Sequence, residues 1–502
     1  MRKATSLERS TGMNKRRIRL LVALPVSLIA LYLLLLIPGG TPPMPDTGEK
    51  EPFVWNQDEY WSSLEDRFKE LRSHDCAALG LPISSRFSRV DSLLAHVRND
   101  TLAPGSPLFS QIEDEFFNLA VLLAACPDRL ADYITTFSNL RTSLKSQSIR
   151  WHMSSRPARD CLYRLLYGGR TAVEEVMLQS QKNSVPALVL ENAEPSVNPA
   201  AEIYGVSIHS GDILVSRGGA PTSALIARGN DYPGNFSHVA LVHIDDSTKA
   251  VSIIEAHIEK GVAVATVDDY LQDTKLRIMV LRLRANLPAL QANPMLPHKA
   301  AEFALRKART VHTPYDFEMD FEDHSELFCS EVVSEAYEEA GITLWMGLSH
   351  ISSIGVKSWL SAFGVQNFVT QEPSDLEYDP QLTVVAEWRD FETLYKDRID
   401  NAVVDIMLEG ADNGDPLDYD LYMLPLARVL KAYSFILNQF DRVGPVPEGM
   451  SATAALRNKW FSERHAATRD RLIALASQSK ENKGYSPPYW ELVKLARVAY
   501  SD

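Results

Sequence analysis

A series of short strand-like runs between residues 212 and 284 constrains the fold of this 502-residue chain more than any other feature. The runs are rich in β-branched residues or alternate between apolar and polar residues, and turn residues separate them, as at 245–249. The predicted strands cover residues 212–216, 236–244, 250–257, 262–267 and 276–284. Because strands this closely spaced are joined by hairpins, we predict an antiparallel sheet.

Helical periodicity lies on both sides of this sheet region. Apolar residues recur at three- and four-residue steps before residue 185 and again after residue 375, most clearly at 421–440 and 454–476. Residues 183–210 are rich in Pro, Asn, Ala and Ser and mark a domain boundary. The predicted fold class is therefore α+β. Its predicted parts are a helical domain at 51–185, a sheet-containing domain at 205–370 and a helical C-terminal region at 375–502.

The N-terminus carries the pattern of a membrane anchor. Residues 1–19 hold seven Lys and Arg residues, and the run at 20–37 is apolar and uncharged. This length is just enough to cross a bilayer, and the basic flank should stay in the cytoplasm. A cleaved signal peptide is the alternative, but the exit at 38–45 lacks small residues in the cleavage pattern. We therefore predict a basic tail at 1–19, a transmembrane anchor at 20–37 and a linker at 38–50.

The distribution of charge disfavours some partners. Residues 1–19 carry a net charge of +6, which leaves −20 for the rest of a chain whose net charge is −14. A body this acidic is a poor binder of nucleic acid or of an anionic lipid surface. We predict no nucleic-acid partner, and a membrane contact through the N-terminal helix.

The four cysteines show no metal-binding spacing. No C-x-x-C pair and no Cys/His ligand pattern occurs, so neither a metal site nor a cofactor is predicted. In an oxidising compartment, one pair among Cys76, Cys126 and Cys161 could form a disulfide. Three free thiols are the alternative, and the sequence does not choose between them.

Cys329 and His238 have the properties of a thiol nucleophile and its base. His238 lies in a predicted strand, and Cys329 lies at the start of a helix predicted at 329–340. A thiol reacts as the thiolate, which the helix N-terminus and a nearby imidazole both favour. The backbone N–H of Cys329 or Ser330 could bind the oxyanion.

A catalytic histidine also needs a group that orients its ring. Glu255 lies in the next predicted strand within apolar sequence, where an unpaired acid would be costly. His257, two residues on, lies on the same strand face and is the rival orienter. Taken alone, such residues more often belong to an ordinary core.

Five short motifs strengthen the catalytic interpretation. They are Gly-Asp-Ile-Leu at 211–214, Ser-His-Val at 237–239, Ile-Glu-Ala at 254–256, Pro-Tyr-Asp at 314–316 and Phe-Cys-Ser-Glu-Val at 328–332. In this order, across residues 205–345, they resemble the YiiX/YaeF-like family of permuted papain-like (NlpC-type) cysteine hydrolases, in which His precedes Cys.

The resemblance implies a permuted papain-like core and a role for each matching residue. Cys329 takes the position of the nucleophile, His238 that of the base and Glu255 that of the orienter. Tyr315 and Asp316 would shape the pocket beside the thiol. Ser330 and Glu331 would cap the helix or contact the substrate.

The leading functional hypothesis is a membrane-anchored, exported thiol amidase or peptidase. Its substrate would be a peptide, for example a cell-wall peptide, if the compartment is a bacterial inner membrane and periplasm. A lipid acyl hydrolase or acyltransferase is the alternative, because relatives similar to lecithin:retinol acyltransferase share the order His, then Cys. A catalytically inactive interaction protein is the third hypothesis.

Overall fold

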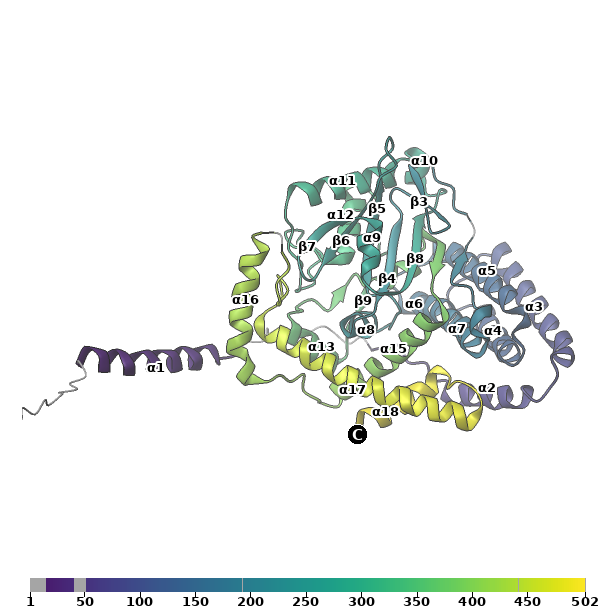
Figure 1. Ribbon diagram of the computed structural model, residues 1–502. Coiled ribbons are helices and arrows are strands. Elements are labelled where there is room, and N and C mark those ends of the chain that lie inside the picture. Colours follow the sequence, from purple (N-terminus) through teal and green to yellow (C-terminus); the bar gives the residue numbers. More distant parts are fainter. Residues whose placement is uncertain (1–14, 40–50, 192, 441, 502) are drawn as a thin grey trace, which may run out of the picture.

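The computed structural model describes residues 15–39, 51–191, 193–440 and 442–501. In this part of the chain, an antiparallel seven-stranded sheet forms the centre, in the order β1-β11-β8-β4-β5-β6-β7 (Figure 1). Its strands are β1 (Leu188–Leu190), β4 (Ile213–Gly218), β5 (His238–Ile244), β6 (Val251–His257), β7 (Gly261–Ala265), β8 (Lys275–Leu283) and β11 (Leu382–Trp388).

The predicted strands all occur, but the sheet is wider than predicted. The runs between residues 212 and 284 form β4 to β8, so the prediction of an antiparallel sheet is confirmed. β11 lies in the region after residue 375 that is predicted to be helical, so the helical prediction is wrong for residues 382–388. It pairs with β8 and β1 and is largely buried. The predicted domain limits at 205 and 370 leave out both β1 and β11.

Two helices cover one face of the sheet. α11 (Leu296–Thr310) and α12 (Cys329–Glu339) pack on apolar residues such as Val239 and Leu241 of β5. The helix predicted at 329–340 is thus confirmed as α12. Gly211, with φ +92°, permits the approach of α11, because a Cβ here would lie 2.3 Å from Pro297 Cβ.

The opposite face of the sheet carries a smaller apolar layer. Leu214, Val242 and Ile278 point to this side, where they meet side chains of α9 (Val267–Gln272) and of the β2–β3 hairpin. The hairpin strands are β2 (Ala200–Ile203) and β3 (Val206–His209), and a second small sheet pairs β9 (Ser349–His350) with β10 (Val369–Thr370).

A helical part with its own apolar core precedes the sheet in sequence. Its helices are α2 (Asp58–Leu71), α3 (Cys76–Asn99), α4 (Pro107–Ala125), α5 (Leu130–Ser148), α6 (Arg156–Leu162) and α7 (Gly168–Gln179). A disulfide between Cys76 and Cys126 joins the start of α3 to the end of α4, while Cys161 and Cys329 are free and buried. The structure thus selects one pairing among those left open by the sequence.

α15, α17 and α18 pack below the sheet in Figure 1 and share an apolar core with α8 and α13, while α16 stands to the left of the sheet and contacts α17. Their bounds are α8 (Pro221–Arg228), α13 (Ile354–Phe363), α15 (Phe391–Asp412), α16 (Leu424–Asn438), α17 (Ala452–Lys483) and α18 (Tyr489–Ser501). The short helices α10 (Pro288–Ala292) and α14 (Asp375–Tyr378) complete the set of α-helices in the described residues apart from α1.

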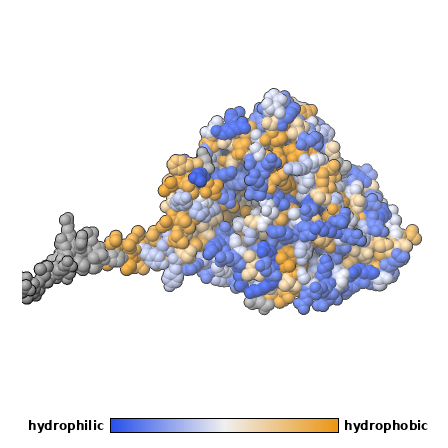
Figure 2. Space-filling model, in the orientation of Figure 1, coloured by the Kyte–Doolittle hydropathy of each residue, from blue (hydrophilic) through white to orange (hydrophobic). Residues whose placement is uncertain are grey.

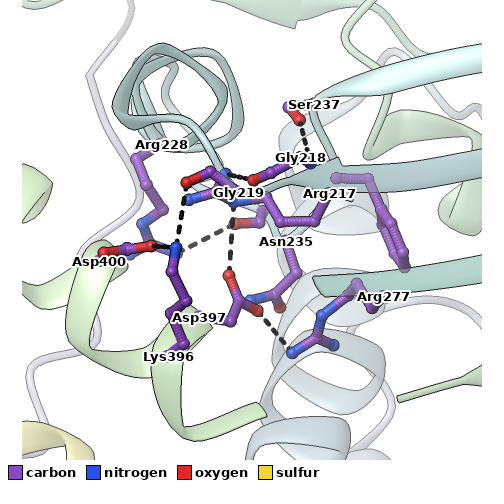
Figure 3. Close-up of polar contacts among 12 residues, drawn as sticks. Arg217, Gly218, Gly219, Arg228, Asn235, Ser237, Arg277, Lys396, Asp397 and Asp400 are labelled. Carbon is purple, nitrogen blue, oxygen red and sulfur yellow. Dashed lines mark hydrogen bonds and ion pairs between the residues drawn. The ribbon is translucent and has the colours of Figure 1, made fainter. Parts of the chain in front are cut away.

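Buried ion pairs join these parts to the sheet. Asp397 of α15 lies 2.6 Å from an Nη of Arg277 on β8 and 3.3 Å from Nε of Arg217 on β4 (Figure 3). Arg277 also donates to Glu174 of α7, over 2.7 Å. Because these four charged side chains are at most 2% exposed, one charge network crosses from the N-terminal helices through the sheet to α15.

α1 (Lys15–Leu35) extends away from the body and contacts α16 at its C-terminal end (Figure 1). Residues 1–14 of the predicted basic tail and 40–50 of the predicted linker lie outside the described residues. Among the residues that the structure describes, no helix is both long enough and apolar enough to cross a membrane. The transmembrane anchor at 20–37 stays a prediction.

Candidate active site

The sheet brings His238 and Glu255 together. β5 and β6 are paired with Ala240 opposite Glu255, which leaves His238 and the carboxylate on the same face. His238 Nε2 lies 2.6 Å from Glu255 Oε2, within hydrogen-bond distance. The structure thus places the predicted base beside its predicted orienter. The catalytic roles of both residues stay predictions.

His257 binds the same carboxylate rather than His238. Its Nε2 lies 3.0 Å from Glu255 Oε1, so Glu255 lies between two imidazoles. Burial acts to raise the pKa of Glu255, but the two histidine hydrogen bonds outweigh it and hold that pKa well below its usual range. Glu255 is therefore a carboxylate at neutral pH, and the proposed rival His257 supports it from the other side.

Cys329 is the first residue of α12, as the sequence predicted. Its side chain is buried in the apolar layer between α12 and the sheet. The N–H of Val239, the residue directly after His238, points at the sulfur. Within the described residues, no hydrogen bond joins Cys329 Sγ to the ring of His238. The Cys329 sulfur thus lies beside Val239, the neighbour of His238 in β5, and makes no hydrogen bond to the His238 ring in the described part of the chain.

Burial decides the protonation of this pair in the resting protein. It raises the pKa of Cys329 to about 12, although the N–H groups of Val239 and Ser330 oppose the shift. Burial also lowers the pKa of His238, although Glu255 opposes this. The N–H of Ser330 at the helix N-terminus acts to lower the thiol pKa, as expected, but burial outweighs it in the resting state. At neutral pH the pair consists of a thiol and a neutral imidazole.

Glu331 acts on its own helix. Its Oε2 accepts a hydrogen bond of 2.7 Å from the N–H of Phe328, the residue before α12. Burial raises the pKa of Glu331 to about 9, so the carboxyl is protonated at neutral pH. Of the two roles that the sequence left open, this geometry is that of a helix cap. Ser330 beside it is fully buried.

Tyr315 and Asp316 differ in their surroundings. Tyr315 packs with the apolar residues around Cys329 and forms an edge-to-face contact with Phe317. The Asp316 carboxylate accepts hydrogen bonds from the N–H groups of Glu318 and Asp320, over 2.6 and 2.7 Å. Asp316 therefore fixes the loop before the nucleophile, while Tyr315 lies among the residues next to the thiol.

Glu372 is a buried acid near the thiol that the sequence analysis missed. Its charge would raise the pKa of Cys329, and burial raises the pKa of Glu372 itself well above its usual range. In the described part of the chain its Oε2 has no hydrogen-bond partner. The sequence around it, Gln371-Glu-Pro-Ser374, has the composition of a loop and gives no sign of burial.

Candidate metal ligands lie away from the thiol. In the described ranges, Cys76, Cys126 and Asp128 lie within reach of one ion, but both thiols are in the disulfide. His243, His298 and Glu302 form a second such group. His243 lies five residues from His238 along β5, so this group belongs to the far end of the strand.

An apolar cavity of about 380 Å³ lies on the sheet face that carries His238 and Glu255. Beyond His238 and Glu255 this face of β5 and β6 becomes apolar, since Val242 pairs with Ile253 two residues beyond the Ala240–Glu255 pair. Tyr270 lines the cavity and is close enough to Glu255 and Cys329 for their charges to raise its pKa. The residues around it are Leu188, Ile203, Leu214, Val242, Ile253, Tyr270, Leu271, Ile278 and Trp388.

Comparison with known proteins agrees with this site. Residues 207–386 match the model of a family described as "Permuted papain-like amidase enzyme, YaeF/YiiX, C92 family". A crystal structure described as the metalloprotein yiiX from Escherichia coli O157:H7 (DUF1105) is 18% identical. It aligns over 36% of this chain and 97% of its own, with a TM-score of 0.28. No curated protein matches the chain. The predicted family resemblance and the prediction of a thiol-dependent hydrolase are thus confirmed for this domain.

Proposed function

We propose that this permuted papain-like amidase domain cleaves an acyl bond through Cys329, His238 and Glu255. The observation that carries the proposal is the His238–Glu255 pair, held on β5 and β6 next to the helix N-terminus that bears Cys329. Glu255 stays charged and His238 stays neutral, which are the states that an orienter and a general base require.

The hydrogen bond of His238 assigns its two ring nitrogens. Nε2 faces Glu255, which leaves Nδ1 to take the proton from the Cys329 thiol. The sulfur then attacks the acyl carbon, and the tetrahedral intermediate collapses as His238 returns the proton to the leaving group. Water, deprotonated by the same nitrogen, attacks the acyl-enzyme and releases the acid and the thiol. Backbone N–H groups at the start of α12 bind the oxyanion.

Opening of the site precedes this reaction. Cys329 is 4% exposed, and its pKa near 12 gives almost no thiolate at neutral pH. A substrate that seats its carbonyl against the sulfur must bring the thiol within reach of Nδ1 of His238. The transfer of the thiol proton to His238 is then coupled to the attack by the sulfur, and no thiolate forms beforehand.

The compartment we propose is outside the cytoplasm. The Cys76–Cys126 disulfide fits an oxidising compartment, where such bonds persist. The basic and apolar pattern of residues 1–37 fits an N-terminal anchor that leaves the body outside, as on the periplasmic side of a bacterial inner membrane. In that setting, an amide in a cell-wall peptide is the first candidate substrate.

A lipid acyl bond is the second candidate, which the apolar cavity favours. A cavity of about 380 Å³ lined by aliphatic and aromatic side chains accepts an acyl chain better than a charged peptide. It lies on the sheet face that holds His238 and Glu255, and its lining residue Tyr270 is close enough to Glu255 and Cys329 for their charges to raise its pKa.

Hydrolysis assays on the full chain separate these candidates. The purified protein is incubated with peptidoglycan fragments or with phospholipid vesicles, and released amines and fatty acids are measured. We expect Cys329→Ala to lower the rate about a thousandfold or more on the true substrate. Cys161→Ala, at the other free buried cysteine, should keep the activity. Full activity of Cys329→Ala would refute the thiol mechanism, and no release from either substrate would refute both substrate assignments.

A further inference from the structure

α16 presents an apolar stripe to the surface. Leu426, Val429, Tyr433 and Ile436 follow one another at steps of three and four residues and therefore share one face, and Phe440 lies in the turn directly after the helix. Each is exposed, with exposed fractions from 49% at Leu426 to 71% at Phe440. The other face of the helix is already buried against the body through Leu424, Ala427 and Ser434. The helix thus has an apolar side beyond the one that its own fold uses.

The same helix holds the end of the N-terminal apolar helix. Arg428 donates to the carbonyl groups of Leu35 and Ile37, over 3.1 and 2.5 Å, where α1 ends. The hydroxyl of Tyr32 donates to the carbonyl oxygen of Tyr422, just before α16. A cation at the C-terminal carbonyls of a helix stabilises it. α1 therefore leaves the body directly at the apolar stripe.

The two apolar surfaces are continuous. The described side chains of α1 are also exposed, among them Leu28, Leu31 and Leu34. Figure 2 shows the hydrophobic colour running from α1 onto the adjoining end of the body, where Figure 1 places α16. A large apolar patch is rare on a soluble protein and marks an interaction surface.

Local charge identifies the partner. Residues 421–440 contain Arg428 and Lys431 and no acidic residue, although the whole chain carries a net charge of −14. Both cations donate to carbonyl groups of the protein, Arg428 at the end of α1 and Lys431 at Pro447 and Glu448, so the exposed stripe itself carries no charge. An uncharged apolar stripe that includes Tyr433 fits the boundary of a lipid bilayer, where apolar and aromatic side chains of this kind gather.

We propose that the exposed stripe of α16 lies flat in the surface of a lipid bilayer, beside the point where α1 enters it. The helix has 15 residues, hence a length of about 22 Å along the surface. Its buried side holds the body, so α16 fixes the height and tilt of the whole domain above the lipid. The inference rests on the proposed N-terminal anchor, but it does not depend on the thiol chemistry.

Labelling two valines tests this placement. Val429 on the stripe and Val498 on α18 are 58% and 51% exposed and are matched in size. Each is replaced by cysteine (Val429→Cys or Val498→Cys) and labelled with a small environment-sensitive fluorophore. The full chain is reconstituted in vesicles of phosphatidylcholine and phosphatidylglycerol. Quenching is compared between a nitroxide on the lipid acyl chain and iodide in the buffer.

The expected result is loss of most emission at position 429 with the lipid nitroxide, and little loss with iodide. Position 498 should show the reverse. Quenching of position 429 by iodide alone would overturn the proposal, because the stripe would then face water. Protection from both quenchers would also overturn it, because a second protein surface would then cover α16.

A second variant removes the apolar contact without touching the label. Ile436→Glu places a charge about two turns beyond Val429 on the exposed stripe, where it cannot disturb the core. In the Val429→Cys background it should abolish quenching by the lipid nitroxide. The amidase assay in solution should be unchanged, which separates a failure of this inference from a failure of the proposed function. Unchanged lipid quenching in this variant would refute the role of the stripe.

Discussion

Three carboxyl groups around Cys329 show that partners, more than position, decide the charge of a buried acid. Glu255 is buried but receives two histidine hydrogen bonds, and its pKa is held low. Glu331 is buried with one backbone N–H, and its pKa rises to about 9. Glu372 has an oxygen without a partner in the described residues, and burial raises its pKa well above the usual range. The site therefore combines one fixed negative charge with two neutral acids.

The charge of Glu255 is expected to matter for turnover and for its pH dependence. Glu255→Gln keeps a hydrogen-bonding group beside His238 but removes the charge, and should lower kcat/KM about 10²- to 10⁴-fold. Glu255 raises the pKa of His238, so its loss lets that pKa fall. Since the base must be neutral, the acidic limb of the pH–rate profile should move to lower pH. The profile of kcat/KM against pH checks this.

Glu259→Gln is the control for this variant, because Glu259 is an exposed acid just beyond the same strand. It should leave both the rate and the profile unchanged. An unchanged profile in Glu255→Gln, with a rate close to that of the parent, would show that His238 does not depend on this carboxylate.

Glu331 should make the protein less stable as the pH rises. Its pKa is about 9 in the folded state and near the ordinary value of 4.5 for a glutamate in the unfolded state. Between these values the folded state holds a proton that the unfolded state has lost, so stability falls with pH by up to about 1.4 kcal/mol per unit. Glu331→Gln removes this pH-dependent loss of stability. We expect its Tm, relative to the parent, to rise between pH 5 and pH 8.

The same comparison on Glu338→Gln provides the control, because Glu338 is exposed on the same helix. Its Tm relative to the parent should not change with pH. A constant difference for Glu331→Gln as well would mean that Glu331 is ionised in the folded protein, contrary to the effect of its burial.

At the scale of elements, the disulfide constrains the N-terminal helices. Cys76 and Cys126 are 50 residues apart in sequence, and a closed loop of this size lowers the entropy of the unfolded chain by the equivalent of about 4 kcal/mol. The double variant Cys76→Ser/Cys126→Ser should lose up to about this much free energy of unfolding in urea. Cys161→Ala, which breaks no crosslink, should lose less. Equal losses would show that the bridge adds no stability.

The elements that carry the site could be predicted from local sequence, and the rest of the sheet could not. β5 and β6 have alternating or β-branched sequence and are separated by a turn. They are therefore recognisable as a hairpin, and the pairing of its strands predicts that His238 lies beside Glu255. β11 is Leu-Thr-Val-Val-Ala-Glu-Trp, a short apolar run that periodicity cannot distinguish from a buried helix. Its place between β1 and β8 depends on pairings across more than 90 residues of chain.

The protonation of Cys329 was unpredictable for a related reason. A helix N-terminus is a local feature that lowers a thiol pKa, and the sequence shows it. Burial is a property of the whole fold, since α12, β5 and the loop with Tyr315 close over the sulfur together. Burial outweighs the helix here. The place of Cys329 at the start of α12 could therefore be predicted from the sequence, while its resting protonation could not.

At the scale of the whole molecule, one charge network joins the parts. Asp397 on α15 neutralises Arg217 and Arg277 in the sheet, and Arg277 also binds Glu174 of the N-terminal helices (Figure 3). Removing one partner of a buried ion pair leaves an uncompensated charge, which costs about 3–5 kcal/mol. Because the network spans three parts of the chain, the loss of one charge should weaken the association of these parts and also lower the stability of each part.

Asp397→Asn tests the network against its neighbour Lys396→Met. Asp397 is fully buried, whereas the ion pair of Lys396 with Asp400 is part-exposed at the lysine and should contribute about 1 kcal/mol or less. We expect Asp397→Asn to lower the Tm strongly and to split a single calorimetric transition into two, as the N-terminal helices and the sheet unfold separately. Lys396→Met should keep one transition near the parent Tm. If Asp397→Asn also unfolds in one transition near that Tm, the charges do not couple these parts, and apolar packing alone holds the molecule together.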